Sequence, residues 1–138
     1  ILKLLLDAVH DASRRTVSAL IMKALRKRQV KIFEMLLNRY KEYLIPWDRI
    51  SSECIFRDNI QIFLIALEFH SYDNHSLFML ACAEFAGEIV GHLLERFEDI
   101  QFEKDAERII DLMTMDVDDA ITPLILNDDR FHVNFDSE

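Results

Sequence analysis

Apolar residues recur along this chain with the 3.6-residue period of amphipathic α-helices. Between about Val30 and Leu44 the apolar positions are separated alternately by three and four residues, so they form one stripe. Charged and amide side chains occupy the opposite side of the same segment. The pattern therefore predicts a helix over these residues that packs through one face.

Further short helices are predicted on both sides of this one. Asn59 is the expected N-cap of one of them, because its side chain can accept a hydrogen bond from the first turn. Pro46 and Asp73-Asn74 mark the linkers between helix pairs. The predicted helices lie near Ser18–Leu25, Ser51–Phe56, Asn59–Glu68, Ser76–Phe85, Gly87–Phe97 and Lys104–Met115.

The scarcity of turn residues separates the fold classes. The chain has only two glycines and two prolines in 138 residues. All-β folds and parallel α/β folds need such residues at frequent turns, so both are disfavoured. We predict an all-α protein.

Self-similar segments recur along the chain. Four apolar segments begin at Ile1, Ile32, Ile62 and Ile89, at intervals of 31, 30 and 27 residues, and a second short helix precedes each of the last three. A helix pair every ~30 residues is typical of an α-solenoid, in which each pair covers the apolar side of the next.

The segment Ser76–Glu95 resembles a degenerate ankyrin repeat. Ankyrin repeats begin with Thr-Pro-Leu-His, continue with Leu-Ala-Ala and a turn, and end with Glu-Ile-Val and Leu-Leu-Leu; here Leu80-Ala81-Cys82 and Glu88-Ile89-Val90 occupy the corresponding places. Ile1–Ala8 is similar to the end of such a repeat, which suggests a piece of a longer protein, and Thr122–Leu126 is similar to the start of another. The glycine that the family keeps in the turn between the helices is replaced by Arg28, Asp58 and Phe85.

The resemblance implies one ankyrin-like domain over residues 1–138. Its expected repeats are residues 1–12 (partial), 13–43, 44–71 and 72–100. Residues 101–138 are expected to be an irregular or capping segment that holds a partial repeat at 120–126. The implied architecture is an α-solenoid of stacked antiparallel helix pairs.

Charge is distributed unevenly along the chain. The formal net charge is −9, which argues against general nucleic-acid binding, but residues 1–50 carry +6 and residues 51–138 carry −15. Arg26, Lys27 and Arg28, with Lys23 and Lys31, form the densest basic cluster. This cluster suits an acidic segment of a protein partner, and less well phosphates or a nuclear-import receptor; the alternative is a solvated helix face. The polarity also fits a second copy of the chain, as in a homodimer.

Residues for catalysis or metal binding have no recognisable spacing. Cys54 and Cys82 are isolated and are expected to be reduced core residues of a cytoplasmic or nuclear protein. Residues 116–119 are acidic but lack the glycine and closing glutamate of a calcium loop. No apolar run approaches the ~18 residues of a membrane span. We therefore predict no enzyme activity, no metal, no cofactor and no membrane span.

The ankyrin resemblance also implies a binding surface, formed by the loops between helix pairs and by the first helix of each pair. Its expected loop residues are Arg14, Arg15, Trp47, Asp48, Tyr72, Asp73 and His75, and its inner-helix residues are Lys23, Arg26, Lys27, Glu53, Phe56, Arg57 and Glu84. Trp47 is the strongest single candidate, because Trp is enriched at binding hot spots; its alternative role is to close the core after Pro46. The predicted function is a protein–protein interaction module, an adaptor or scaffold. The alternative is a structural assembly or dimerisation module of a larger protein.

Overall fold

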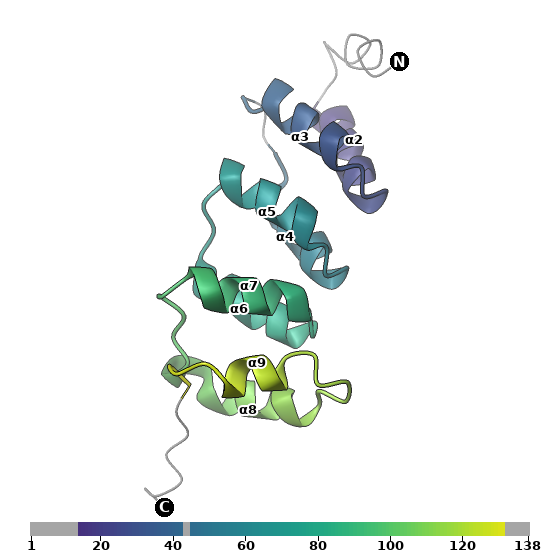
Figure 1. The fold of residues 1–138 in the computed structure, drawn as a ribbon. Coiled ribbons are helices and arrows are strands. Elements are labelled where there is room, and N and C mark those ends of the chain that lie inside the picture. Colours follow the sequence, from purple (N-terminus) through teal and green to yellow (C-terminus); the bar gives the residue numbers. More distant parts are fainter. Residues whose placement is uncertain (1–13, 43–44, 132–138) are drawn as a thin grey trace, which may run out of the picture. The chain divides into compact units, whose positions relative to one another are not determined.

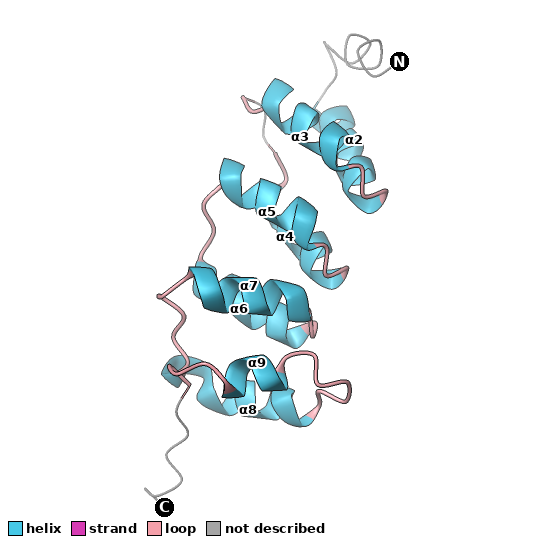
Figure 2. Cartoon of the chain, viewed as in Figure 1, coloured by secondary structure: helices cyan, strands magenta, loops and turns pink. Residues whose placement is uncertain are grey.

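The computed structural model describes residues 14–42 and 45–131, with the side chain of Arg14 left out, and these residues form helices without any strand (Figures 1 and 2). The prediction of an all-helical fold is confirmed for this part of the chain. The helices are α2 (Arg14–Arg26), α3 (Val30–Arg39), α4 (Trp47–Phe56), α5 (Ile60–Phe69), α6 (Asn74–Ala83), α7 (Gly87–Arg96), the 3-10 helix η1 (Glu103–Asp105), α8 (Ala106–Thr114) and α9 (Thr122–Leu126).

The chain divides into two compact units. In the described chain, unit 1 comprises residues 14–42, 45–54 and 59–71, and unit 2 comprises residues 55–58 and 72–131. Unit 1 carries ten basic and five acidic side chains, whereas unit 2 carries five basic and sixteen acidic ones. The division at residues 71 and 72 coincides with a predicted repeat boundary, and the charge asymmetry of the sequence follows it.

Unit 1 is built on the predicted apolar stripe of α3, which packs against α2 and α5. Phe33, Leu37 and Tyr40 of that stripe are buried. The helix itself is shorter than predicted, because it ends at Arg39 and the N–H of Tyr40 closes its last turn on the carbonyl of Leu36. The far end of the predicted helix, Leu44, lies outside the described residues.

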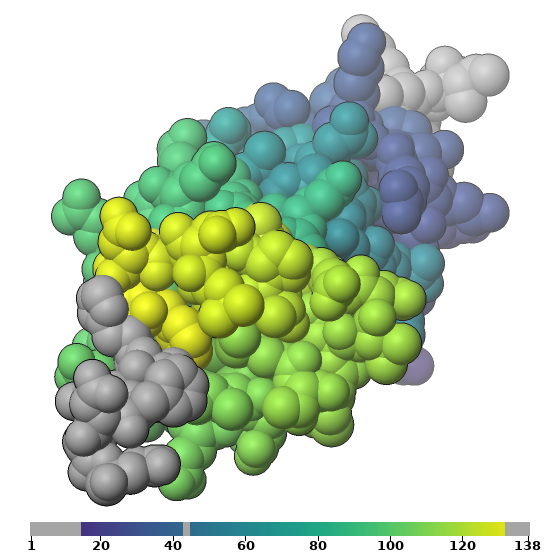
Figure 3. Space-filling model, turned by 60° about the horizontal axis from the view of Figure 1, so that its bottom comes forward, coloured from purple at the N-terminus to yellow at the C-terminus, as the bar shows by residue number. Residues whose placement is uncertain are grey.

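Unit 2 contains two helix pairs in two layers. Helix α6 packs against α7 and α8, and α7 packs against α9. Residues 100–131, yellow-green to yellow in the space-filling view, pack closely together on the face shown there (Figure 3). Beyond residue 100 the chain forms η1, α8 and α9, and α8 lies within the helix predicted near Lys104–Met115. The short helix α9 begins at Thr122, where the partial repeat was predicted.

Three hairpin turns share one backbone geometry. Arg28, Asp58 and Phe85, which replace the expected glycine, have φ angles of 55°, 48° and 55°. In each turn the N–H of this residue binds the carbonyl three positions earlier, and the next N–H binds the carbonyl five positions before it. This is the Schellman ending of a helix, which most often uses glycine. The turns therefore keep the glycine conformation with residues that adopt it at a cost.

Asp58 and Gly87 position α7 within unit 2. The carboxylate of Asp58 accepts hydrogen bonds from the N–H groups of Glu88 and Ile89, at 3.3 and 3.2 Å, in the first turn of α7. A Cβ atom at Gly87 would lie 2.8 Å from the carbonyl oxygen of Ala120, so the absence of a side chain permits this close approach. At Gly91 a Cβ atom would make only ordinary contact with Leu124.

Candidate functional site

A groove of about 340 Å³ lies between α2 and α3 in unit 1. Leu20, Lys23 and Ala24 line it from one face of α2, and Lys27 lines it from the turn directly after that helix. Gln29, Ile32 and Leu36 line it from the turn and α3. Leu20 and Ile32 are partly exposed. We call this feature the α2/α3 groove; it has an apolar floor and a basic edge.

The lysines at its edge are free of ion pairs within the described part of the chain. Lys23 and Lys27 are exposed and have no acidic partner there. Arg26, which shares their helix face, is paired with Glu53 of α4 through Nη2 and Oε1 at 3.0 Å. Such an exposed pair contributes little stability, but it partly neutralises Arg26. The two lysines are therefore the cations that an external carboxylate can reach.

The structure places the predicted arginine pair and Trp47 in helices, so the expectation that they lie in loops is wrong. Arg14 and Arg15 begin α2. The side chain of Arg14 lies outside the described residues, and that of Arg15 is exposed. Trp47 begins α4 and stacks on His70 of α5, with ring centroids 4.9 Å apart and an interplanar angle of 7°. Its ring is half-buried and takes part in the packing of unit 1.

The remaining predicted contact residues are divided between the two units. Asp48 was also predicted in a loop, which is wrong, because it lies exposed in the first turn of α4. Tyr72 and Asp73 lie in the loop before α6, as predicted, Tyr72 half-buried and Asp73 exposed. The Oγ of Ser76 donates to Asp73 at 2.7 Å, and this hydrogen bond holds the pKa of Asp73 below its usual value. The local role of Asp73 is thus to begin α6.

His75 is buried in the first turn of α6, so its predicted position at a loop tip is wrong. The N–H of Gln101 donates to its Nδ1 at 3.0 Å. Nδ1 is therefore unprotonated, and Nε2 carries the hydrogen that it donates to Asp105 at 2.8 Å. His75 connects α6 to the start of α8 and is occupied on both ring nitrogens.

The predicted inner-helix residues of the two units also differ in their surroundings. Glu53 is partly exposed and paired with Arg26, whereas Phe56, Arg57 and Glu84 are exposed. Phe56, the apolar residue among them, has 70% of its surface exposed. Arg57 and Glu84 lie in the turns after α4 and α6, so their predicted place on the inner helices is wrong. These residues fall on both sides of the division between units.

The cysteines are buried, as predicted. Burial raises the pKa of the Cys54 thiol to about 12, with a further contribution from Glu53. Burial raises the pKa of Cys82 to about 12 as well, with a contribution from Asp116. Both are therefore protonated and poor nucleophiles at neutral pH. Across residues 14–42 and 45–131, no group of three or more His, Cys, Asp and Glu side chains is arranged to hold a metal ion.

Asp116 is a structural residue that sequence reasoning missed. The residue is buried, with 7% of its surface exposed. It accepts hydrogen bonds from the N–H groups of Ala120, Ile121 and Thr122 and from the Thr122 hydroxyl, at 2.8 to 2.9 Å. Burial acts to raise its pKa, but these hydrogen bonds outweigh burial and hold the pKa below its ordinary value. The acidic stretch that contains Asp116 therefore forms the turn into α9.

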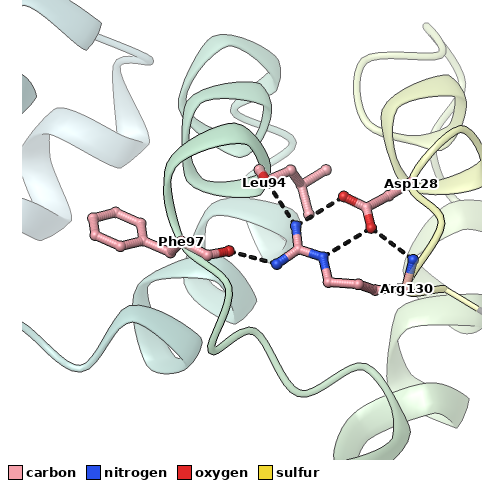
Figure 4. A network of polar contacts seen from close by, with 4 residues as sticks. All are labelled: Leu94, Phe97, Asp128 and Arg130. Carbon is pink, nitrogen blue, oxygen red and sulfur yellow. Dashed lines mark hydrogen bonds and ion pairs between the residues drawn. The ribbon is translucent and has the colours of Figure 1, made fainter.

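A second structural network surrounds Arg130 (Figure 4). Its guanidinium donates to the carbonyls of Leu94 and Phe97 at the end of α7, and pairs with Asp128. The hydrogen bond between Arg130 and Asp128 raises the pKa of Arg130 and lowers that of Asp128. This arginine thus satisfies carbonyls at the end of α7 that the helix leaves unpaired. Arg130 lies more than thirty positions along the chain from both carbonyls, so no local pattern indicates the contact.

Comparison of the chain with protein-family models, with curated proteins and with solved structures finds no match. No helix in the described part of the chain is both long and apolar enough to cross a lipid bilayer.

Proposed function

We propose that this chain is a non-enzymatic protein-binding module, an adaptor or scaffold of the ankyrin-like helical-repeat type. Its α2/α3 groove binds an acidic amphipathic helix of a partner protein. The observation that supports this proposal most directly is that the groove combines an apolar floor with two exposed lysines. These lysines have no acidic partner among the described residues. The proposed setting is the cytoplasm or nucleus.

The dimensions of the groove suit a short helical segment. Its α2 edge runs from Leu20 to Lys27, which at 1.5 Å per residue is about 10 Å, or two helical turns. A helix docks in such a groove through apolar side chains at positions i, i+3 or i+4, and i+7. Ala24, at the middle of the edge, leaves room for one of these side chains.

The positive charges beside the groove favour some partner helices over others. Lys23 and Lys27 are four residues apart, so both ammonium groups lie on one edge of the groove. Carboxylates at a spacing of four on the bound helix can face both of them. The net charge of +5 on the described residues of unit 1 adds attraction at longer range. The partner helix is therefore acidic along the side that faces α2.

The hairpin turns support the ankyrin-like part of the proposal. Arg28, Asp58 and Phe85 recur at intervals of 30 and 27 residues with the same backbone hydrogen bonds. A common turn in three consecutive helix pairs favours a repeat protein over a single irregular bundle.

The test uses the full chain and a labelled synthetic 16-residue helical peptide. The peptide has leucines along one face and glutamates four residues apart beside them. Two further peptides replace every glutamate with glutamine, or every leucine with serine. We expect the acidic peptide alone to bind, with fluorescence anisotropy as the readout.

A pair of charge variants locates the site. Lys23→Glu/Lys27→Glu should weaken binding at least tenfold, because it replaces attraction with repulsion at the groove. Lys41→Glu/Arg49→Glu changes the net charge of unit 1 by the same amount at exposed positions that do not line the groove, and should change the affinity less than twofold. Equal effects of the two variants would contradict the proposal.

One alternative occupant lies within the chain. Residues 1–13 contain Asp7 and Asp11 at the same spacing of four. If the acidic peptide bound only to the Asp7→Lys/Asp11→Lys variant of the full chain, the groove would belong to the chain's own first residues and the proposal would be wrong.

The second candidate function is assembly of copies of the chain. Unit 2 exposes Met115, Val117 and Leu126, with Val117 91% exposed. If these residues mediate self-association, sedimentation velocity should show a concentration-dependent dimer that Val117→Ser/Leu126→Ser abolishes. A monomer at all concentrations would exclude this function and leave recognition of another protein.

A further inference from the structure

Unit 2 has a groove of its own, between α6 and α8, with a volume of about 380 Å³. Ser76, Met79, Leu80 and Ala83 line it from α6. Their spacing of three, one and three residues places them on one face of that helix. We call this feature the α6/α8 groove.

Helix α6 is apolar on more than one side. Leu77, Phe78, Ala81 and Cys82 are buried in the core of unit 2. Met79, Leu80 and Ala83 are also apolar, yet they remain partly exposed in the groove. A helix that is apolar on several sides is normally covered on each of them. The α6/α8 groove is thus an apolar strip with room for further side chains, and a methionine in it can adapt to different shapes.

Two cations stand beside this strip. Lys104 and Arg108 line the groove and are exposed. Neither has an ion-pair partner in the described chain. Asp105, a carboxylate that also lines the groove, accepts the hydrogen bond from His75 Nε2 at 2.8 Å. Lys104 and Arg108 can therefore bind an incoming carboxylate without first losing an internal salt bridge.

The surroundings are strongly acidic. The described residues of unit 2 carry a net charge of −11, and Glu103 and Glu107 are exposed beside the two cations. A partner rich in acidic residues would be repelled by this field. A segment with a single carboxylate among basic or uncharged residues would be attracted to the field and could still pair with Lys104 and Arg108.

We propose that the α6/α8 groove is a second docking surface, and that it binds an extended segment of a partner protein. An apolar side chain of this segment packs against Met79 and Leu80, and one Asp or Glu carboxylate lies between Lys104 and Arg108. The rest of the segment is basic. This partner is chemically different from the acidic helix proposed for unit 1, and the two proposals rest on different residues.

The chain has five methionines, so methyl NMR can follow the α6/α8 groove through Met79 and the helices of unit 1 through Met22 and Met35. Met79 lies in the α6/α8 groove, whereas Met22 and Met35 lie on α2 and α3 of unit 1.

The probe is a set of three synthetic peptides in which one leucine and one glutamate are separated by one, two or three serines, with two lysines at each end. Matched peptides carry Leu→Ser or Glu→Gln. The variant Met79→Leu identifies the Met79 signal.

We expect at least one leucine–glutamate peptide to shift the Met79 methyl signal of the full chain while the Met22 signal stays in place. The matched peptides should bind at least tenfold more weakly. Arg108→Glu should also weaken binding at least tenfold, because it removes a charge-assisted hydrogen bond and adds a repulsive carboxylate. Arg96→Glu, the same change at another exposed arginine of unit 2, should alter the affinity less than twofold.

The proposal fails if no peptide shifts the Met79 signal at a peptide concentration of about 1 mM, which detects binding with a Kd of about 1 mM or tighter. It also fails if Arg96→Glu and Arg108→Glu weaken binding equally, since that would reflect only the overall field. Circular dichroism checks that each variant is folded, and Lys104→Ser replaces Arg108→Glu if the latter is not. A shift of Met22 without Met79 would assign the peptides to unit 1 and overturn this proposal alone.

Discussion

The hydrogen-bonded carboxylates of unit 2 and the lysines beside the groove of unit 1 differ in their surroundings. In unit 2 the carboxylates of Asp58, Asp116 and Asp128 bind backbone N–H groups or an arginine that caps a helix. In unit 1 the lysines beside the α2/α3 groove have no acidic partner within the described chain. The acidic charge of unit 2 thus serves its folding in part, whereas Lys23 and Lys27 of unit 1 are available for binding.

Among the substitutions that test this difference between the units, the largest effect on stability is expected at Asp116. Asp116→Ala removes the acceptor for three backbone N–H groups and one hydroxyl, and should lower the free energy of unfolding by about 3 kcal/mol. Urea unfolding followed by far-UV circular dichroism measures it. Asp118→Ala, at an exposed neighbour, is the control and should stay within about 0.5 kcal/mol of the native chain.

A somewhat smaller effect is expected from the glycines of α7. Gly87→Ala should destabilise the chain by about 2 kcal/mol, because its Cβ would collide with the Ala120 carbonyl at 2.8 Å. Gly91→Ala meets only ordinary contact, so its better helix propensity should stabilise the chain by up to about 1 kcal/mol. Thermal melts of the two variants compare them directly. Similar losses at both positions would contradict the close approach at Gly87.

Acid should weaken unit 2 through the same carboxylates. The pKa values of Asp116 and Asp128 are lower in the folded chain than their ordinary value of 3.8. Their contribution to stability is therefore complete above the unfolded pKa, and is lost as the pH falls through the folded values. Urea midpoints measured between neutral pH and about pH 2 should fall most steeply below 3.8, and less steeply in the Asp116→Ala variant. Parallel curves would argue against a role for Asp116.

The smallest expected effect compares two residues in the same turn conformation. Arg28→Gly relieves a positive φ at an exposed position of unit 1, and should stabilise the chain by about 0.5 to 1 kcal/mol. Asp58→Gly gains the same relief but loses the two hydrogen bonds to the first turn of α7, so its net effect should be destabilising. Stabilisation by both substitutions would mean that Asp58 does not support α7.

Much of the helical structure could be predicted from local periodicity in the sequence. The contacts between residues far apart in the sequence could not. The stripe of α3 follows from spacing alone, whereas the turn positions of Arg28, Asp58 and Phe85 came from the resemblance to ankyrin repeats. Asn59 was predicted as an N-cap, and its side chain accepts a hydrogen bond from the N–H of Ile62 at 3.3 Å.

Contacts between residues far apart in the sequence could not be predicted from local spacing. The stacking of Trp47 on His70 joins positions 23 residues apart, and His75 meets Asp105 across 30 residues. Whether an aromatic or histidine side chain is free to bind a partner depends on such pairings, which one sequence does not reveal. This is why Trp47 and His75 were predicted as contact residues but are engaged within their units.

The most direct test of the difference between the units is the salt dependence of acidic-peptide binding, compared between the native chain and Lys23→Glu/Lys27→Glu. Raising sodium chloride from about 50 to about 500 mM shortens the screening length severalfold. The native chain should lose at least tenfold in affinity, and the variant should bind weakly at both concentrations. An affinity of the native chain that does not change with salt, or a variant that binds as the native chain does, would contradict the claim that Lys23 and Lys27 of the α2/α3 groove serve recognition.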